Sequence, residues 1–568
     1  MISDITVTGR HKMILFRKLL LSVLLIILSS GNVFSQGYLN GAVSSAHRLA
    51  TEAGIDILRR GGNAIDASVG AGFVLAVVYP QAGNIGGGGF MVIHLKDGKN
   101  TSIDYREKAP LLASRNMYID ANGEIISGLS TIGSMAAGVP GSVAGMLYTL
   151  EKYGTMNRAS ILKYAIDIAD TGFIVEDRLA EAVRNCNREF ERFDGSRILF
   201  GTGFKAGEKF VQKDLAETLR RISSEGRDGF YKGTTAQLIV DEMRSSNGII
   251  SFEDLTLYEP KERDVVRGTY KGYEIISMGP PSSGGISLIY LLNILENYDI
   301  RSMGYGSRET VQLMTEAMRR VYADRSEFMG DLDFVNVPID ILTSKVYAER
   351  RMQDFKPGEA TNSETVKPGD AYYRESDQTT HYSVADSYGN LVSATTTLND
   401  VFGNKVVVQG AGFLLNNEMD DFSSKPGTPN LYGLVGNEAN AIEPGKRMLS
   451  SMTPTIIFKN SKPFLITGSP GGGRIITTVL QSFLNLAEHG RSLKDAIDLP
   501  RFHHQWLPDE IQMESSFSDE QTRKDLSNMG YKIKNISDFG RVDAIYFEDD
   551  GTMSAHSDRR GYGYSLGY

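Results

Sequence analysis

The sequence predicts an α/β fold in which β-sheets are covered by helices on both sides. Three observations support this class: apolar residues at helical spacing, short strand-like runs between the helical segments, and two glycine-rich loops where these elements meet. A helix–sheet–sheet–helix sandwich is one arrangement that satisfies all three. The chain has 568 residues, which is too long for a single small core and suggests several packed layers.

Helices are expected near the start of the chain, through its middle third and again in its last quarter. Apolar residues recur at helical spacing over residues 49–58, and a Gly-Gly pair then ends the helix. Asn63 can cap the next helix, which extends to Val78. The middle third, residues 157–325, alternates amphipathic helices with short loops, and a late helix is expected over residues 475–488.

Strands are expected in two groups. The first follows the Gly86–Gly89 loop, with one strand over residues 90–94 and another ending near Tyr105. The second group lies in the last third of the chain and includes a hairpin whose turn spans residues 386–390. Its expected strands are residues 381–385, 391–397, 452–458 and 464–468.

The first 35 residues have the pattern of a signal peptide. A basic start is followed by an apolar run over residues 19–28 and by small residues that favour cleavage after Ser35. Met13 is an alternative start that would make the pattern more typical. A membrane anchor is the other interpretation, but the apolar run is shorter than the roughly 20 residues that span a bilayer. We therefore expect export, to the periplasm or beyond the cell.

Composition narrows the possible partners. Lys and Arg total 60 and Asp and Glu total 69, so the formal net charge is −9, which gives no reason to expect a nucleic-acid partner. The single cysteine, Cys186, cannot form an internal disulfide. No His and Cys residues have the spacing of a metal site, and no cofactor motif is present, so we expect neither metal nor cofactor.

Thr379 is the most informative position. Residues 355–376, rich in Pro, Gly and charge, are expected to be exposed and mobile, and they lead to a strand that begins with Thr379. Cleavage before Thr379 would give it a free α-amine beside its own hydroxyl. With a pKa of about 8, that amine is partly neutral at pH 7 and can accept the hydroxyl proton. A Thr-Thr pair before a strand indicates, by itself, no more than β-propensity.

Several motifs in order along the chain resemble those of one family. The run TTHYSV at residues 379–384, followed by Asp386, Gly389 and Asn390, resembles the start of the small subunit of γ-glutamyltransferases. Further resemblances lie at residues 415–422 (LNNEMDDF), 450–454 (SSMTP), 468–474 (GSPGGGR), 500–508 (PRFHHQWLP), 80–90 (PQAGNIGGGGF) and 104–110 (DYREKAP). Together they extend from about residue 41 to residue 568.

The resemblance implies a fold, an activity and a processing step. The fold is the αββα four-layer sandwich of N-terminal nucleophile hydrolases. The implied enzyme is a γ-glutamyltransferase and glutathione hydrolase, made as a zymogen that cuts itself between Gln378 and Thr379. Residues 36–378 would form the large subunit and residues 379–568 the small one, paired as a heterodimer in one domain. Glutathione and other γ-glutamyl compounds would be donors, and water, amino acids or dipeptides would be acceptors.

The resemblance also implies roles for individual residues. Thr379 would be the nucleophile, assisted by Thr397, and Gly471 and Gly472 would donate backbone N–H groups to the oxyanion. The rest would bind the γ-glutamyl group: Arg106, Ser450 and Ser451 its α-carboxylate, Asn399, Glu418 and Asp421 its α-amine, and Tyr432 as a lid. Bacterial relatives often carry Gln where this chain has Glu418.

The chemistry of these residues agrees with the implied roles. A γ-glutamyl group is zwitterionic at its far end, and Arg106 can clamp a carboxylate with two donors while acidic residues bind the amine. Acyl transfer forms a tetrahedral oxyanion. Two glycine N–H groups at the start of a helix suit it because glycine allows close approach and the helix end is partly positive.

Other interpretations of the same residues exist. The glycine loops resemble phosphate cradles, but no Lys-Ser or Lys-Thr follows them and the GxGxxG spacing is absent. Glu418, Asp420 and Asp421, taken alone, favour a solvated acidic turn over a calcium site. His503 and His504 lack an accompanying Ser or Cys motif, so we expect them to be structural. The rival functions are a cephalosporin acylase or polyglutamate-processing relative, and an inactive exported binding protein.

Overall fold

Two antiparallel sheets form the centre of the structure. A computed structural model describes residues 37–201, 203–367, 378–425 and 438–568. The expected signal peptide, residues 1–35, lies outside the described residues. The account below concerns the unit from Tyr38 to Tyr568.

The first sheet has seven strands and contains Thr379 in an interior strand. In spatial order the strands are β18 (Tyr564–Gly567), β1 (Gly41–Ser45), β9 (Gln378–Asp386), β10 (Leu391–Asn399), β2 (Gly88–His94), β3 (Asn100–Asp104) and β6 (Lys261–Arg263). All neighbouring strands run antiparallel.

The second sheet has six strands and packs face to face on the first. Its spatial order is β17 (Met553–Ser557), β16 (Asp543–Phe547), β12 (Lys462–Thr467), β11 (Thr455–Lys459), β8 (Tyr273–Ser277) and β7 (Val266–Tyr270). Strands β16 and β12 lie against β9, and β11 lies against β10. Both sheets therefore combine strands that precede Thr379 with strands that follow it.

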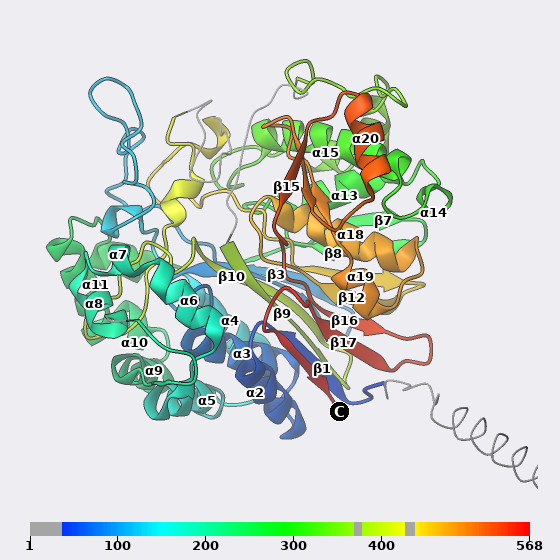
Figure 1. The fold of residues 1–568 in the computed structure, drawn as a ribbon. Coiled ribbons are helices and arrows are strands. Elements are labelled where there is room, and N and C mark those ends of the chain that lie inside the picture. Colours follow the sequence, from blue (N-terminus) through cyan, green and yellow to red (C-terminus); the bar gives the residue numbers. More distant parts are fainter. Residues whose placement is uncertain (1–36, 202, 368–377, 426–437) are drawn as a thin grey trace, which may run out of the picture. The chain divides into compact units, whose positions relative to one another are not determined.

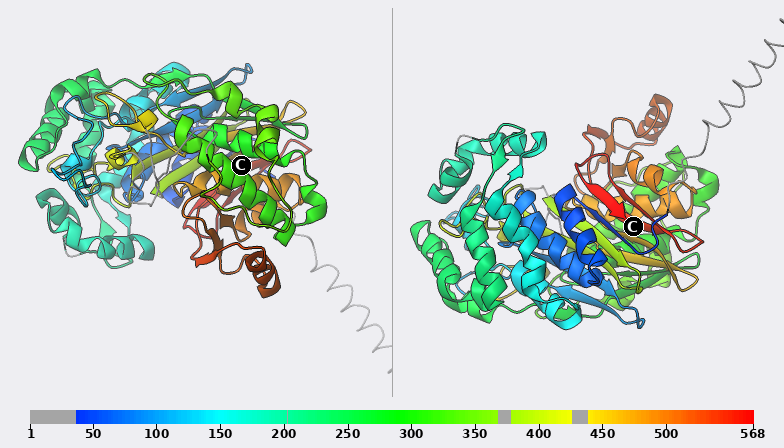
Figure 2. Two further views of the ribbon diagram at one scale, coloured as in Figure 1. Left: turned by 90° about the horizontal axis from the view of Figure 1, so that it is seen from above. Right: turned by 90° about the horizontal axis from the view of Figure 1, so that it is seen from below.

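Helices cover the outer face of each sheet (Figures 1 and 2). On the seven-stranded sheet lie α2 (Arg48–Arg59), α3 (Ala64–Val78) and α4 (Ser142–Tyr153), with α5 (Arg158–Thr171) and α9 (Lys213–Glu225) packed behind them. On the six-stranded sheet lie α13 (Gly284–Leu295), α15 (Arg308–Phe328) and α18 (Arg474–Ala487). The predicted αββα sandwich is thereby confirmed.

Shorter elements complete the described chain. The helices are α6 (Asp177–Asn185), α7 (Asn187–Phe190), α8 (Asp194–Phe200), α10 (Asp228–Tyr231), α11 (Gly233–Ser245), α12 (Phe252–Leu257), α14 (Ile300–Met303), α16 (Ile339–Leu342), α17 (Lys345–Arg351), α19 (Leu493–Asp498) and α20 (Glu520–Asn528). The 3-10 turns are η1 (Ser134–Ala136), η2 (Glu418–Asp421) and η3 (Glu438–Asn440). The small strands are β4 (Phe173–Ile174), β5 (Lys209–Phe210), β13 (Phe502–His503), β14 (Ile511–Glu514) and β15 (Ile533–Ile536).

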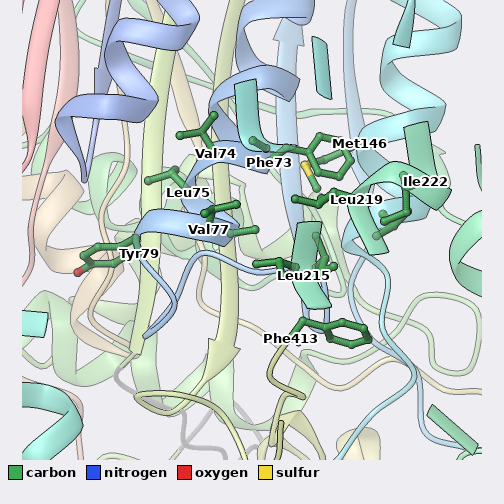
Figure 3. Close-up of a cluster of buried hydrophobic side chains, with 14 of the residues drawn as sticks. Phe73, Val74, Leu75, Val77, Tyr79, Met146, Leu215, Leu219, Ile222 and Phe413 are labelled. Carbon is green, nitrogen blue, oxygen red and sulfur yellow. The ribbon is translucent and has the colours of Figure 1, made fainter. Parts of the chain in front are cut away.

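Helix α3 is the centre of one apolar layer. Every residue of this helix is buried, and its side chains meet those of α4 and α9 (Figure 3). Asn63 caps the helix, and the Asp66 side chain completes a capping box by accepting the backbone N–H of Asn63. A helix that is apolar on all sides must be enclosed by other elements, so α3 is packed between the seven-stranded sheet and the outer helices.

Most predicted elements are confirmed to within a few residues. The caps and apolar spacing located α2 and α3, and the hairpin turn lies between β9 and β10 with Gly389 at φ 94°. The expected exposure of residues 355–376 is wrong in part, and residues 368–377 lie outside the described chain. Ser363 and Val366 are buried because the Trp506 indole donates hydrogen bonds to both of their carbonyls, at 2.8 and 3.1 Å.

Gly468, which directly follows β12, allows the two sheets to approach each other. The ring of His381 on β9 fills the space where a Gly468 side chain would lie, and this ring is also held by Thr395 and Ser383. We predict that Gly468→Ala lowers the free energy of unfolding by about 1–3 kcal/mol through overpacking. Thermal unfolding of the purified protein measures the change.

Gly279→Ala is the matched control, because an added Cβ there meets one Val266 methyl at 3.1 Å rather than a buried ring. Equal thermal stability of the Gly468→Ala protein and the wild type would contradict the packing argument.

Candidate active site

Thr379 lies in a small pocket at the start of strand β9, an interior strand of the seven-stranded sheet. Its side chain is 4% exposed. The pocket brings together nearly all the residues predicted from the sequence, and it is lined by Arg106, Thr379, Thr397, Asn399, Glu418, Asp421, Ser450, Ser451, Met452, Gly472 and Ile475. Residues separated by more than 300 positions in the sequence thus meet around one hydroxyl group.

A bulge in β10 directs two side chains toward Thr379. Pairing with β9 shifts between the Thr396–Thr380 and Asn399–Gln378 pairs, so β10 contains one extra residue. Asn399 has φ 73°, and its backbone N–H donates to the Thr397 hydroxyl at 2.8 Å. The bulge thereby places Thr397 and Asn399 on the pocket side, and the hydrogen bond holds the Thr397 oxygen in position.

The Gly86–Gly89 loop supports this bulge from behind. A side chain on Gly87 or Gly89 would overlap the backbone of β10, at the carbonyls of Thr397 and Thr395. Asn84 donates to the Thr397 carbonyl at 2.7 Å and accepts from the Gly87 N–H at 2.9 Å. These glycines therefore serve close packing of backbone, which accounts for them without a bound phosphate.

Arg106 forms ion pairs with two predicted partners of the substrate amine. Its Nη1 lies 2.7 Å from Glu418 Oε2, and its Nη2 lies 2.5 Å from Asp421 Oδ2. Its Nε and Nη2 also donate to the carbonyls of Met448 and Leu449. All three charged side chains are at least 96% buried. The family resemblance implies that Arg106 binds the α-carboxylate of a ligand and that these carboxylates bind its α-amine; in the structure they pair with each other.

The carboxylates of this cluster outnumber its cation. Glu107 adds a third buried acid, with Oε2 3.6 Å from Arg106 Nη1. Burial raises the pKa of Glu107 to about 8, despite the opposing effect of Arg106. Burial likewise raises the pKa of Glu418 well above its usual value and, more modestly, that of Asp421. A bound ammonium group would lower all three pKa values by supplying the missing positive charge.

Ser450 and Ser451 face the pocket from a tightly held turn. Backbone hydrogen bonds join Ser450 to Pro281 and Ser283, at 2.9 and 2.7 Å. The hydroxyl of Ser451 accepts from Arg325 Nη2 at 2.9 Å. Sequence analysis missed Arg325, a second buried cation near the pocket. It lies on helix α15 among other buried arginines, so no local pattern distinguishes it.

The second glycine loop closes the pocket near Thr379. Gly472 lines the pocket, whereas Gly471 lines a larger neighbouring cavity. Their φ values, 56° and 134°, lie in the region that favours glycine. Helix α18 begins immediately afterwards, with Gly473 as its N-cap, so its partly positive end is directed toward this loop.

Of the remaining residues that the sequence singled out, those that the structure describes do not line the pocket around Thr379. Tyr432 lies outside the described residues. Asp420 accepts a hydrogen bond from Ser130 at 2.6 Å and does not line the pocket. His503 is buried between Thr477 and Gln505, and His504 contacts Asp509, so both have structural contacts away from Thr379. Among the described residues, no acidic, His or Cys cluster could hold a metal.

No helix within the described ranges combines the length and apolarity needed to cross a membrane. The expected signal peptide and the alternative anchor fall outside these ranges.

This arrangement provides the components of acyl transfer through a threonine ester. In such a reaction Thr379 would supply the attacking hydroxyl, Gly472 would contribute backbone near the developing oxyanion, and the Arg106 cluster would offer both charges to the acyl group. A zwitterionic acyl group would satisfy that end, because its carboxylate and ammonium could replace the internal ion pairs.

Comparisons with known proteins agree with this description. A sequence profile described as gamma-glutamyltranspeptidase matches residues 50–568. A glutathione hydrolase proenzyme from Escherichia coli (strain K12) is 48% identical over 524 residues, covering 92% of this chain and 90% of its own length. The structure of a cephalosporin acylase from Bacillus halodurans has a TM-score of 0.83 at 26% identity, covering 94% of this chain and 96% of its own.

A second structural match adds to these relatives. The Helicobacter pylori gamma-glutamyltranspeptidase structure is 48% identical, with a TM-score of 0.57, and the match covers 57% of this chain and 94% of that one.

The raised pKa of Glu418 predicts a pH dependence of stability. Above its usual pKa of 4.5, the unfolded chain releases this proton more readily than the folded protein, so stability falls as pH rises. We predict that Glu418→Gln removes part of this loss, up to about 1.4 kcal/mol per pH unit. Melting temperatures at several pH values between 5 and 8 measure the difference.

Glu443→Gln is the control, because this carboxylate is half exposed and pairs with Lys446. Parallel pH profiles for the wild type and Glu418→Gln would exclude a pKa shift at Glu418.

Proposed function

Because the chain belongs to the gamma-glutamyltranspeptidase family, we propose that it is a γ-glutamyltransferase and glutathione hydrolase with Thr379 as its nucleophile. It would cleave the γ-glutamyl amide of glutathione and related compounds. The observation that carries this proposal is the meeting of Thr379 with an arginine–carboxylate cluster in one pocket.

The reaction would proceed in two acyl transfers. The Thr379 hydroxyl attacks the γ-carbonyl carbon while its own α-amine accepts the hydroxyl proton. Collapse of the tetrahedral intermediate breaks the C–N bond, and the departing amine receives that proton. Water or an acceptor amine then attacks the ester carbonyl, the C–O bond to Thr379 breaks, and the Thr379 oxygen regains a proton.

Two groups would assist these steps. Thr397, held by the β10 bulge, would orient the Thr379 hydroxyl. Backbone N–H groups of Gly471 and Gly472 would stabilise the oxyanion, and losing one such donor typically raises the barrier by about 3 kcal/mol.

When the γ-glutamyl group binds, ion pairs between protein side chains would be replaced by ion pairs between those side chains and the ligand. Arg106, Ser450 and Ser451 would bind the α-carboxylate, while Asn399, Glu418 and Asp421 would bind the α-amine. The surplus of buried carboxylates favours a ligand that brings a positive charge. Tyr432 would complete the site as a lid.

The free α-amine of Thr379 would arise by self-cleavage of a precursor. The Thr379 hydroxyl attacks the carbonyl carbon of Gln378, the amide becomes an ester, and water hydrolyses that ester. Residues 36–378 and 379–568 would then be the large and small subunits. They would remain together as a heterodimer because each sheet pairs strands of one part with strands of the other.

Export and acceptor use complete the proposal. We propose that residues 1–35 direct the chain to the periplasm or outside the cell and are then removed, on the basis of their sequence pattern. Amino acids and short peptides would be the acceptor amines.

A cephalosporin acylase is the second candidate, because the acylase structure of Bacillus halodurans has the same fold over 94% of this chain. A glutaryl-type acyl group has a carboxylate but no amine. It would leave Glu418 and Asp421 without a cation when Arg106 binds the ligand, which favours the γ-glutamyl substrate.

We predict that Thr379→Ala abolishes both processing and catalysis, since one hydroxyl performs both reactions. Mass spectrometry of the purified protein should show one uncut chain with no release of p-nitroaniline from γ-glutamyl-p-nitroanilide. Thr379→Ser should retain part of both functions. Thr380→Val is the matched control, because the buried Thr380 hydroxyl has no hydrogen-bond partner among the described residues. Two chains in the Thr379→Ala protein would refute self-cleavage.

We predict that Asp421→Asn lowers kcat/KM for γ-glutamyl-p-nitroanilide by about 10–100-fold, because one charged contact to the amine, worth about 1.5–3 kcal/mol, is lost. Activity on glutaryl-p-nitroanilide, which lacks that amine, should change little. Asp420→Asn tests the adjacent carboxylate outside the pocket. Equal losses on both substrates would contradict amine recognition by Asp421, and activity on the glutaryl substrate alone would favour the acylase.

A further inference from the structure

A second and much larger cavity lies beside the catalytic pocket. It has a volume of about 1100 Å³, slightly above the range of about 300–1,000 Å³ that is usual for small-molecule sites. Helix α6 forms one wall, and residues 536–541 and 559–562 form the other. Gly471 lines this cavity while Gly472 lines the catalytic pocket. The glycine loop is therefore a shared wall between the two spaces.

Arg541 lies on this cavity close to the glycine loop. Its backbone N–H donates to the Ser469 hydroxyl at 3.0 Å, and the preceding Gly540 lies against Gly471. Its guanidinium contacts the hydroxyl and ring of Tyr79, which are uncharged. Within the described residues, Arg541 forms no ion pair with a carboxylate.

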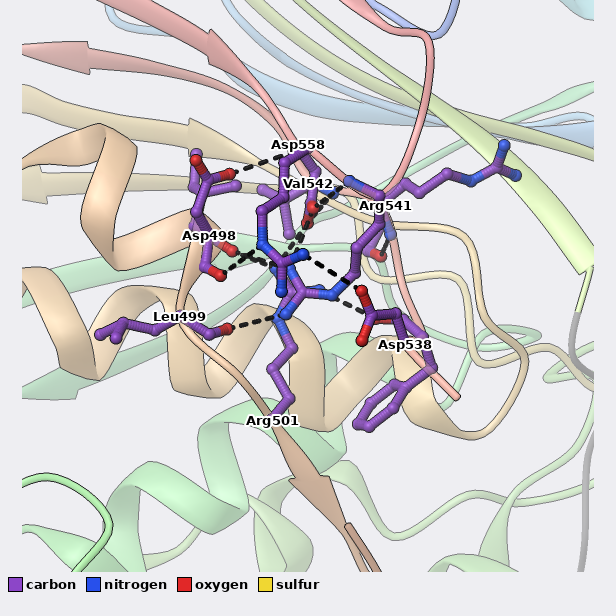
Figure 4. A network of polar contacts seen from close by, with 12 residues as sticks. Asp498, Leu499, Arg501, Asp538, Arg541, Val542 and Asp558 are labelled. Atoms are coloured by element: carbon purple, nitrogen blue, oxygen red, sulfur yellow. Dashed lines mark hydrogen bonds and ion pairs between the residues drawn. The ribbon is translucent and has the colours of Figure 1, made fainter. Parts of the chain in front are cut away.

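Other arginines of the cavity wall are already engaged. Arg560 is paired with Glu514 and Asp558, and Arg559 with Asp538. In Figure 4 the side chain of Arg541 points away from the contacts around Asp558 and Asp538. Across the cavity, Arg178 donates to the carbonyl of Arg560 and stacks on the ring of Tyr562. Arg474, which directly follows the glycine loop, donates from Nε to Gln512 Oε1 at 3.0 Å and lies over the ring of Phe539. Arg541 is thus a cation beside the glycine loop whose contacts among the described residues are with an uncharged side chain.

The chemistry of acyl transfer indicates what this cavity would hold. The acyl group occupies the catalytic pocket, so the group on the nitrogen side of the reacting bond must extend past the oxyanion loop. Space on the Gly471 side of that loop belongs to the large cavity. For a peptide leaving group or an amino-acid acceptor, that portion ends in a carboxylate, which pairs well with a guanidinium.

We propose that the large cavity binds the amine-side partner of the reaction, the leaving peptide of the donor or the acceptor, and that Arg541 pairs with its carboxylate. This inference rests on the proposed function. Arg541, about 70 positions beyond the glycine loop in the sequence, would then determine the preference for partners with a free carboxylate.

The test compares partners with and without that carboxylate. In hydrolysis, the wild-type protein should cleave glutathione with a kcat/KM about tenfold above that for glutathione amidated at its glycine. In transfer from γ-glutamyl-p-nitroanilide, the KM for the acceptor glycylglycine should be about tenfold lower than the KM for glycylglycinamide. Arg541→Gln should remove both preferences while changing hydrolysis of γ-glutamyl-p-nitroanilide by less than about twofold. Arg541→Lys should restore part of each preference.

Two variants separate a specific pair from general effects. Tyr79→Phe removes the Tyr79 hydroxyl from Arg541 without changing charge, and Arg178→Gln removes one positive charge from the opposite wall; both should retain the carboxylate preferences. Loss of preference in Arg178→Gln as large as in Arg541→Gln would overturn the assignment. The assignment would also be overturned if the wild-type protein did not distinguish the carboxylate from the amide in either assay. That comparison does not depend on the folding of any variant. A wild type that cleaves no γ-glutamyl donor would instead refute the proposed function.

Discussion

The position of β9 between β1 and β10 is the constraint on which the site depends. Thr379 begins this strand, so its location is set by antiparallel pairing on both sides. Neighbours on one side of β9 come from the start of the chain, and the hairpin partner follows it. A backbone break before Thr379 would leave this pairing intact from Thr379 onward, because the hydrogen bonds between strands do not require continuity of the chain. The sheet can therefore present a new amino terminus at a fixed place.

The charge cluster around Arg106 meets a second constraint, the energetic cost of burying charged side chains. Unpaired charges are costly to bury, and removing one partner of a buried pair typically costs about 3–5 kcal/mol. Pairing Arg106 with Glu418 and Asp421 avoids that cost. A zwitterion provides both charges at once, so the pocket can open its internal pairs without leaving a charge unmatched. A ligand with one charge alone cannot achieve this.

Local sequence patterns predicted the elements, and the family resemblance implied the candidate site residues, but neither indicated how those residues interact. The cap at Asn63, the hairpin at residues 386–390 and the glycine loop before α18 each depend on neighbours in sequence, and each was located correctly. The pairing of Arg106 with Glu418 joins residues more than 300 positions apart, so spacing carries no information about it. Arg325 and Arg541 were missed for the same reason. The close packing of Gly87 against Thr397 depends on a bulge that only strand register reveals.

The two spaces on either side of the glycine loop have different physical characters, and this separates the two halves of specificity. The catalytic pocket is small and lined by buried charges, so its ion pairs belong both to the fold and to the site. The second cavity is much larger, and Arg541 reaches it from a backbone that hydrogen-bonds to Ser469 beside the loop. If the large cavity holds the amine-side partner, substitutions there would change that partner while the acyl pocket and Thr379 keep their positions. The acyl group would then be constrained by ion pairs that also stabilise the fold, whereas the leaving group and the acceptor would not.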